Sequence, residues 1–436
     1  MFNLIPGLDD PAAVGREMHA LVSELFPLNR SLTGEGLRET LRKISAGRPL
    51  EIRSLPTGTP ILDWTVPKEW NLNGAWIKDP SGQVVVDAKR SNLHVVGYSM
   101  PVRARMPLAE LKKHLHTLPD HPDWIPYRTS YYKETWGFCL THRLLESLSD
   151  GEYEVCIEST LADGVLNWGE AVLPGETTDE VLISAHVCHP SLANDNLSGI
   201  AAAVFLARRL AGVRRKYTYR FLFAPGTIGG LAWLAQNEKT AGRVKHGLVL
   251  ACLGDAGDPT YKRSEAGNAP VDRVVALALR DRDKPFRVVD FTPYGYDERQ
   301  YNSPGFRLPV GCLMRSMYGT FPEYHTSADN LDFVRPEALA DSLDLLLSIV
   351  NILENDAVGV NKNPRGEPQL GRRGLYDHLG GRNEAAQAQL ALLWVLNQSD
   401  GRRSLLDIAE RSGLPFQAIL AAAAELAKGD LLEIRA

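Results

Sequence analysis

The chain has 436 residues, of which 44% are hydrophobic and 23% are charged, and its formal net charge is −5. That composition is ordinary for a globular protein of two or three domains, and the lack of a long basic run argues against a nucleic-acid interface. No apolar run approaches the roughly 20 residues that span a bilayer, so we expect no membrane partner. Five widely spaced cysteines, an odd number, argue against a disulfide framework and predict a reducing, cytoplasmic location.

The first part of the chain predicts two helices joined by a short loop. Residues 11–26 carry apolar side chains at helical spacing, and a second helix is expected after the loop RSLTGEG at 30–36. Thr33 in this loop is a candidate N-cap for that helix. The alternative is that the loop is exposed and places Arg30 and Thr33 near a functional site.

Residues 50–105 predict a small antiparallel β module. Short β-type runs are separated here by Pro, Gly and Asn, and the turn at 79–82 is typical of a hairpin. We expect Trp64, Trp70 and Trp76 to form the core of the module, because aromatic side chains supply large buried areas. Nothing in this part of the chain suggests catalysis.

A stretch dense in aromatic and polar side chains, DHPDWIPYRTSYYKETWGFCL at 120–140, follows a short helix. One interpretation is a long loop that packs across the domain. The alternative is the wall of a substrate pocket, since pockets are largely apolar and aromatic with a few placed polar groups. In that case Arg128 or Tyr131 would contact the substrate.

Strands and helices alternate from about residue 152 to residue 358. Such alternation predicts an α/β fold, with a mostly parallel sheet and helices on both faces. We assign residues 1–49 and 106–358 to this domain, with the β module inserted between them. Residues 359–383, rich in Gly, Pro and Arg, are expected to be a linker.

The last segment, 384–436, has the helix–helix–helix–strand order of a winged-helix domain. It carries five Lys or Arg against seven Asp or Glu, a net of −2, and the expected recognition helix, 415–428, has almost no positive charge. DNA binding needs basic side chains that neutralise phosphates. We therefore expect no nucleic-acid partner and favour an interaction module through which the chain could form homo-oligomers.

Candidate metal-binding chemistry concentrates in one stretch, 181–210. An apolar strand is expected at 181–185 and a helix at 200–210. Between them lie six side chains that bind metals or support metal ligands: His186, Cys188, His189, Asn194, Asp195 and Asn196. Ligands bind in open α/β sheets where a strand ends and a helix begins. The stretch therefore predicts a divalent-metal site, and we expect zinc.

Further strand ends carry candidate ligands or catalytic groups. Asp255 follows the apolar strand GLVLACLG, the run Asp297-Glu298-Arg299 follows another strand and a turn, and His325 precedes the last long helix. Histidine and carboxylate groups brought from several strand ends are the donors of a first-row metal site. Their recurrence in one α/β domain strengthens the expectation of a metal.

Six motifs spread over most of the chain carry a family resemblance: RSLTGEG, IPYRTSYYKETWGFC, HVCHPSLANDNLSG, APGTIGG, GYDERQY and EYHTSADNLDF. On these motifs the chain resembles the zinc aminopeptidase and glutamate-carboxypeptidase-like superfamily. More closely, it resembles bacterial aminopeptidase-like proteins with an inserted β domain and a winged-helix tail. The resemblance implies that His186 and His325 are metal ligands and that Asp195 is the carboxylate that bridges two metals. It places Asp255 near the superfamily's terminal carboxylate ligand.

The sequence departs from the superfamily at three positions. Cys188 stands where an Asp usually orients the first histidine, and a thiol there could bind metal instead. The superfamily's adjacent Glu-Glu pair, general base and then metal ligand, falls on Gly226 and Thr227. Loss of the ligand implies a single zinc ion, and loss of the base puts hydrolytic turnover in doubt.

Other residues are candidates for the missing roles. Glu298 is the first candidate to replace the base and Glu323 the second, and the alternative role for Glu298 is an ion pair with Arg299. His189 could be a metal ligand, a hydrogen-bonding partner of the substrate or a support for another ligand. The expected substrate contacts are Arg128, Tyr131, His189 and Arg299.

The sequence therefore predicts a zinc-dependent, aminopeptidase-like amide hydrolase that acts on a small peptide or aminoacyl conjugate. In such a site the metal polarises the amide carbonyl and acidifies its bound water, and a carboxylate takes the proton. The alternative is a non-catalytic descendant of the fold that binds a metal or ligand and assembles through its winged-helix tail.

Overall fold

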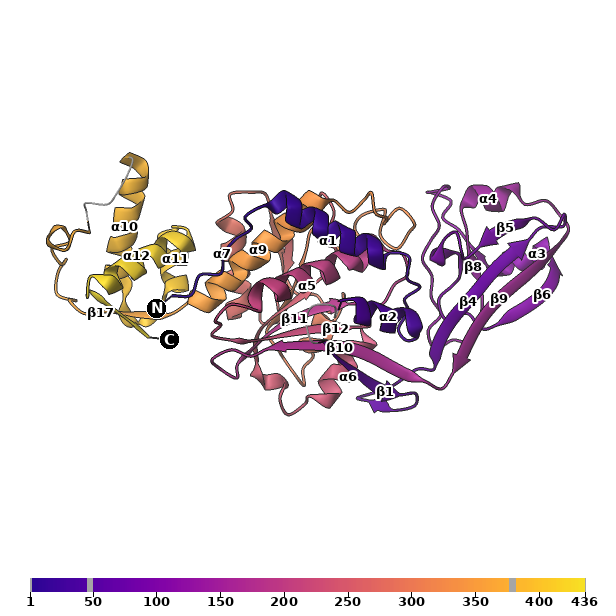
Figure 1. Cartoon of the computed structure of the whole chain (residues 1–436), viewed down its shortest axis with the longest axis horizontal. Coiled ribbons are helices and arrows are strands. Elements are labelled where there is room, and N and C mark those ends of the chain that lie inside the picture. The colour runs from indigo at the N-terminus through magenta and orange to yellow at the C-terminus, as the bar shows by residue number, and fades with distance from the viewer. Residues whose placement is uncertain (1, 45–49, 376–381, 436) are drawn as a thin grey trace.

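The computed structural model describes residues 2–44, 50–375 and 382–435. Figure 1 shows three parts in a row: a mainly helical C-terminal part, a central domain built on a large sheet, and a β-rich part at the far end. Within the described ranges, no helix has both the length and the apolar character that a membrane span requires.

A sheet of eight strands forms the middle of the molecule. The strands are β1 (Glu51–Pro56), β10 (Val165–Leu173), β11 (Glu180–His186), β12 (Thr218–Ala224), β13 (Val244–Leu250), β14 (Thr260–Lys262), β15 (Arg287–Val289) and β16 (Val310–Met314). Their order is β1-β10-β12-β11-β13-β16-β14-β15. The four middle strands, β12, β11, β13 and β16, run parallel, and β10 and β14 pair with them in antiparallel fashion. This confirms the predicted α/β fold with a mostly parallel sheet.

Helices cover both faces of this sheet. Successive residues of a strand point to opposite faces, so Ile183 of β11 packs with one set of helices and Leu182 with the other. The first set is α1 (Pro11–Leu25), α2 (Glu35–Ile44), α5 (Gly199–Leu210), α7 (Pro270–Arg280) and α9 (Pro336–Asn355). The second set is α6 (Ile228–Gln236) and α8 (Glu298–Tyr301). Burial on both faces explains why the strands read as continuous apolar runs.

The β module contains a second sheet, made of β4 (Glu69–Lys78), β5 (Val84–Asp87), β6 (Val102–Pro107) and β9 (Glu152–Ala162). All its pairs are antiparallel, in the order β5-β4-β9-β6. The strands do not follow the expected boundaries at 50 and 105. β9 extends the module to Ala162, and β1 belongs to the central sheet, where it pairs with β10. Short elements complete the module: β2 (Pro60–Ile61), β3 (Trp64–Thr65), α3 (Leu108–Leu111), β7 (Leu115–His116), β8 (Phe138–Cys139) and α4 (His142–Ser147).

The tryptophans of the module do not share one core. The hairpin predicted at 79–82 connects β4 to β5, and Trp70 is buried while Trp76 is half-buried. Trp64 is 51% exposed and lies on the β2–β3 hairpin, with its ring 6.1 Å from that of Tyr132. The expectation of a three-tryptophan core is therefore wrong for Trp64, because a hairpin of two-residue strands leaves its side chains at the surface.

The C-terminal part is a winged-helix fold, as predicted. Its elements are β17 (Val358–Asn361), α10 (Arg382–Gln398), β18 (Asp400–Ser404), α11 (Leu405–Ser412), α12 (Phe416–Lys428) and β19 (Leu432–Arg435). The strands form a sheet in the order β18-β17-β19. Strand β17 therefore brings the start of the segment expected to be a linker into the fold. Residues 376–381 of that linker, and 45–49 of the first expected domain segment, lie outside the described residues.

The winged-helix part packs against the central domain and continues its apolar core. Asp281, which follows α7, accepts a hydrogen bond at 2.7 Å from the backbone N–H of Phe416, the first residue of α12. Arg273 of α7 forms an ion pair with Asp407 of α11 at 2.6 Å. Polar contacts and apolar packing thus join the two parts.

Candidate functional site

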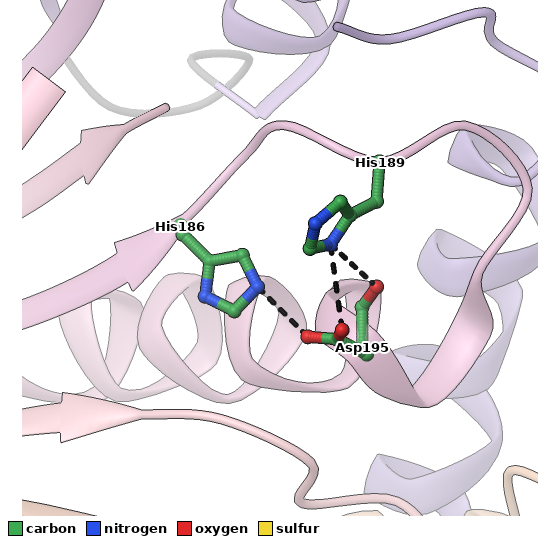
Figure 2. A group of neighbouring side chains, drawn as sticks. All are labelled: His186, His189 and Asp195. Carbon is green, nitrogen blue, oxygen red and sulfur yellow. Dashed lines mark hydrogen bonds and ion pairs between the residues drawn. The ribbon is translucent and has the colours of Figure 1, made fainter. Parts of the chain in front are cut away.

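Three side chains that could bind a metal meet where the middle strands end. Strand β11 ends at His186, His189 follows, and Asp195 lies with non-helical backbone angles in the turn at Ala193–Ser198 that leads directly into α5. The ligand atoms of these three residues all lie within 4.8 Å of one another. Figure 2 shows both imidazoles directed at Asp195. The site therefore lies at the strand-to-helix turn that the sequence singles out.

Asp195 is the hub of this cluster. Its Oδ1 lies 2.8 Å from His186 Nε2 and accepts a hydrogen bond from the Tyr296 hydroxyl at 2.7 Å. Its Oδ2 lies 2.9 Å from His325 Nε2 and 3.4 Å from His189 Nδ1. The structure thus brings together four of the predicted site residues, which we call the His/Asp cluster: His186, His189, Asp195 and His325.

The protonation states in the cluster suit metal binding. Burial opposes the ionisation of Asp195, but the nearby imidazole of His189 and the hydrogen bonds from His186 and His325 outweigh it and hold the pKa of Asp195 well below its ordinary value. Burial lowers the pKa of His189 to about 3. At neutral pH the site therefore offers a carboxylate and a neutral imidazole, which are the forms that bind metals.

The donor set fits a zinc ion. Imidazole nitrogens and a carboxylate oxygen are the ligands of many catalytic zinc sites. The His186 ring is also restrained from outside the cluster, because Asn196 Nδ2 lies 3.2 Å from His186 Nδ1 and is itself fixed by a hydrogen bond to the Leu250 carbonyl oxygen at 2.8 Å. Contacts of this kind orient histidine ligands in metal sites. Asn196 thus restrains the His186 ring, which is the role that the resemblance places on an Asp at position 188.

Cys188 does not join the ligand group. Burial raises the pKa of its thiol to about 12, and its Sγ accepts a hydrogen bond from the Gly226 backbone N–H at 3.3 Å. Since the thiolate is the form that binds metal, this buried thiol is a weak candidate. A Cβ atom at Gly226 would lie 3.2 Å from His186 Cβ, so position 226 directly borders the cluster.

The structure does not bring Asp255 to the cluster, contrary to the expected ligand role. Its Oδ1 accepts hydrogen bonds from Ser316 Oγ at 2.6 Å and from the Gly257 N–H at 2.7 Å. Its Oδ2 accepts one from Asn194 Nδ2 at 2.9 Å. The turn after β13 directs this carboxylate into a hydrogen-bonded network that supports the turn carrying Asp195.

Glu298 does not lie where a catalytic base is needed. Its side chain is fully buried, and its Oε1 pairs with Lys262 Nζ at 2.9 Å and not with Arg299. A general base must reach the proton that it abstracts, and neither Glu298 nor Glu323 lines the cavity beside the cluster. Glu298 stays out of the cavity because it is the first residue of α8, where its side chain turns towards Lys262 of β14.

A cavity of about 630 Å³ opens beside the cluster and is lined by its three histidines and by Gly226. Of the expected substrate contacts, Tyr131, His189 and Arg299 line this cavity, but Arg128 does not. Arg128 is exposed on the loop that carries Tyr131. The aromatic stretch therefore supplies part of a pocket wall, and its arginine points elsewhere.

Several residues at the site were not predicted from the sequence. Asp329 Oδ2 accepts the backbone N–H of Asp195 at 2.9 Å, and the Tyr324 hydroxyl lies 2.9 Å from that of Tyr296. All three side chains lie inside the motifs GYDERQY and EYHTSADNLDF, so the motifs were the available signal. Arg30 is different, because one expectation for the loop at 30–36 placed it near a functional site. It does lie there, but buried and not exposed, and its Nε donates to the His189 carbonyl oxygen at 3.1 Å.

Proteins from Clostridium acetobutylicum match nearly all of this chain. A Clostridium acetobutylicum protein is 48% identical over 427 residues, 98% of each chain, and is named "Putative polysaccharide biosynthesis protein with aminopeptidase-like domain". A crystal structure from the same organism, described as a "putative peptidase", is 47% identical, covers 97% of each chain and has a TM-score of 0.93. A zinc aminopeptidase from Bacillus subtilis has a TM-score of 0.56 at 14% identity and covers 77% of this chain and 94% of its own. The central domain therefore has an aminopeptidase-like fold.

Two family models divide the chain between them. Residues 357–434 match a winged helix-turn-helix, and residues 19–356 match the family described as Domain of unknown function (DUF4910). The boundary between the two matches agrees with the start of β17 at Val358. The chain belongs to the DUF4910 family, with an aminopeptidase-like fold that carries a winged helix at its C-terminal end.

Proposed function

We propose that this protein is a zinc-dependent amide hydrolase that holds one ion and turns over slowly. The observation that carries the proposal is the convergence of His186, His189 and Asp195, whose ligand atoms lie within 4.8 Å of one another beside a cavity of about 630 Å³. His325, which contacts Asp195 Oδ2 at 2.9 Å, is the further donor. The substrate that we propose is a small peptide or aminoacyl conjugate, met in the cytoplasm.

Two tyrosines of the chain would orient the ligand Asp195 and a bound substrate around such an ion. Zinc supplies polarisation of an amide carbonyl and acidification of water. Tyr296 donates to Asp195 Oδ1 at 2.7 Å and shares a hydrogen bond with Tyr324 at 2.9 Å. Both tyrosines line the cavity, so their hydroxyls orient Asp195 and offer hydrogen bonds to a bound substrate.

Slow turnover follows from the missing base. The resemblance places the base at Gly226, and among the described residues that line the cavity none is Asp or Glu. A positioned acid or base contributes roughly 10²–10⁴-fold to catalysis. Its loss leaves the metal site and the cavity intact and lowers the rate by a factor of that order.

A second function has an observation in its favour. The cavity wall lacks a carboxylate within the described part of the chain, and Glu298 is sequestered by Lys262. The protein could therefore bind a metal and a ligand without cleaving the ligand, and assemble through its winged-helix part. The two functions differ in whether wild-type protein releases product.

Gly226→Glu separates the two functions. The new side chain would begin 3.2 Å from His186 Cβ and 3.9 Å from Cys188 Sγ, so it reaches the cluster after a small local shift. We expect wild-type protein with zinc to release p-nitroaniline slowly from aminoacyl-p-nitroanilides, and Gly226→Glu to do so roughly 10²-fold faster or more. Gly226→Gln has the same shape without basicity and should stay at the wild-type rate.

The outcomes decide between the proposals. Wild-type activity that disappears in His186→Ala supports the hydrolase. Activity found in Gly226→Glu alone supports the non-catalytic function, and wild-type activity that survives in His186→Ala contradicts the role of the cluster. N-acylated amino acids belong in the same assay, with release of the free amino acid as the readout.

A further inference from the structure

The wall of the cavity beside the cluster carries formal charge of one sign. Lys133 and Arg299 line the cavity, and among the described residues of its wall there is no Asp or Glu. The carboxylate of Asp195 lies fully buried and is contacted by three histidines and a tyrosine hydroxyl. A ligand entering the cavity therefore meets positive charge and no free carboxylate.

Arg299 is a cation that forms no hydrogen bond or ion pair within the described residues. Within the described part of the chain its guanidinium takes part in no hydrogen bond or ion pair, and its Nε is buried with no acceptor. Its acidic neighbours form no hydrogen bond or ion pair with it: Glu298 pairs with Lys262 at 2.9 Å, and the two oxygens of Asp297, although they feel the charge of Arg299, have no hydrogen-bond partner. By contrast, Arg220 in the same domain pairs with two glutamates at 2.7 Å each.

An unpartnered guanidinium at a cavity favours an anionic ligand. A buried donor without an acceptor is rare in native proteins and calls for an explanation. Arginine presents its donors in a planar fork that matches a carboxylate, and such charge-assisted bonds are roughly twice as strong as neutral ones. An ammonium group would find no carboxylate on this wall, so its desolvation would stay uncompensated.

Aromatic side chains make up much of the remaining wall. Trp64 and Tyr132 line the cavity with 51% of each residue exposed, and their rings lie 6.1 Å apart. Tyr294, which also lines the cavity, is 69% exposed. Large exposed aromatics that gather at one opening mark a binding surface, and this one suits an aromatic or large apolar side chain.

We infer that the cavity takes an amide that carries a carboxylate and a large apolar group, and that Arg299 binds the carboxylate. The amide in this inference rests on the proposed function. The inference narrows the proposed substrate class to amides that have a free carboxylate and no free α-amine. An N-acylated aromatic amino acid has the amide, the carboxylate and the large apolar group, and its α-amine is blocked. Binding requires no turnover, so the inference can be tested apart from hydrolysis.

Three ligands of matched size and different charge test the preference. N-acetylphenylalanine is anionic, N-acetylphenylalaninamide is neutral and phenylalaninamide is cationic. Isothermal titration calorimetry on the zinc-loaded, full-length protein should find the anion bound at least about tenfold more tightly than the neutral amide, and the cation bound most weakly. Binding of the cation as tight as that of the anion, or binding of none of the three, would overturn the inference. Phenyl phosphate is a fourth ligand for comparison. If it binds more tightly than N-acetylphenylalanine, the anion that Arg299 prefers is a phosphate, and the carboxylate part of the inference is wrong.

Matched variants assign the preference to Arg299 and not to the metal. Arg299→Gln should bring the anion-to-neutral ratio of affinities close to one and leave the affinity for the neutral amide unchanged. Arg287→Gln, which removes an exposed arginine of β15 outside the cavity lining, should keep the ratio. His186→Ala should keep it too, because this variant loses a metal ligand and retains the guanidinium. A full preference in Arg299→Gln would contradict the inference.

Failure of this inference and failure of the proposed function look different. If the anion is preferred but no amide is cleaved, the cavity binds as inferred and the hydrolase proposal is wrong. If aminoacyl anilides are cleaved and the cationic ligand binds best, the hydrolase stands and the role of Arg299 is wrong.

Discussion

Lys262 and Glu298 form an ion pair that solvent does not reach: Nζ lies 2.9 Å from Oε1, and both side chains are 0% exposed. Lys262 also donates to the Tyr294 carbonyl oxygen at 2.7 Å. This contact ties β14 to the loop whose next tyrosine, Tyr296, donates to Asp195. The pair thus supports the His/Asp cluster from a distance while it keeps Glu298 out of the cavity.

Lys262→Met should destabilise the protein by about 3–5 kcal/mol, because it leaves Glu298 buried without its partner. The double variant Lys262→Met/Glu298→Gln should recover much of this loss, because the charge that needed compensation is gone. Urea unfolding followed by circular dichroism measures both changes. Equal destabilisation of the single and double variants would show that lost packing, and not the unpaired charge, sets the cost.

The position of the site could be predicted from the sequence, but the direction of individual side chains could not. His186, Asp195 and His325 were expected near strand ends, and the structure joins them because the carboxyl ends of parallel strands share one edge of a sheet. Asp255 also follows a strand, yet its carboxylate binds Ser316 Oγ at 2.6 Å. Hydrogen bonds between neighbouring turns decide where such a side chain points, and apolar periodicity carries no signal for them.

Strand partners set a second limit on prediction. Alternation of strands and helices is a local property, so the α/β domain and the winged helix could be read from the sequence. The partners of β1 and β9 are not local: β1 pairs with β10 in the central sheet, and β9 pairs with β4 in the module. Composition alone therefore misplaces the boundaries of the β module.

His186→Ala should remove zinc from the protein. Wild-type protein loaded with zinc and dialysed should retain one ion per chain, and the variant should retain almost none, because the cluster loses one of its imidazole donors. His246→Ala is the matched control: His246 is 7% exposed at the opposite end of the sheet, on β13. Elemental analysis measures the number of zinc ions retained per chain. Two ions per wild-type chain would contradict a mononuclear centre, and none would contradict the zinc proposal.

Asp297 gives the protein a pH dependence that can be isolated. It is fully buried, and neither oxygen has a hydrogen-bond partner among the described residues. Burial, reinforced by the neighbouring Glu298 and only partly opposed by the charge of Arg299, raises the pKa of Asp297 to about 8. Because this value exceeds the unfolded value of about 4, the contribution of Asp297 to stability is fully present below about pH 4 and is lost as the pH rises to about 8.

Asp297→Asn should therefore gain stability relative to wild type as the pH rises. Between about pH 4 and about pH 8 the difference in unfolding free energy should grow by about 1.4 kcal/mol per pH unit and then level off. Urea unfolding across this range measures it. Asp63→Asn, which changes an exposed aspartate of the β2–β3 hairpin, is the matched control. A constant difference for Asp297→Asn would show that burial does not hinder its ionisation.

The first turn of α12 is occupied by the central domain. Asp281 accepts a hydrogen bond from the Phe416 N–H at 2.7 Å, and Arg280 Nη2 donates to the Leu414 carbonyl oxygen at 2.8 Å. In helix-turn-helix proteins that read DNA, the N-terminal residues of the recognition helix contact bases in the major groove. Here that end of the helix faces α7, so DNA can reach it only if the two parts separate.

We therefore expect no specific DNA binding by the full-length chain. Fluorescence anisotropy with a labelled duplex should show at most non-specific affinity, with a Kd of about 10⁻⁴–10⁻⁶ M that weakens steeply with salt. Asp281→Ala should lower the stability by about 0.5–2 kcal/mol, because it removes a cap from α12. It should not create DNA affinity, because the basic residue of α12 is Lys428, in its last turn. Tight, sequence-dependent binding by wild-type protein would show that the two parts separate in solution, and it would overturn the interpretation of the winged helix as an interaction module.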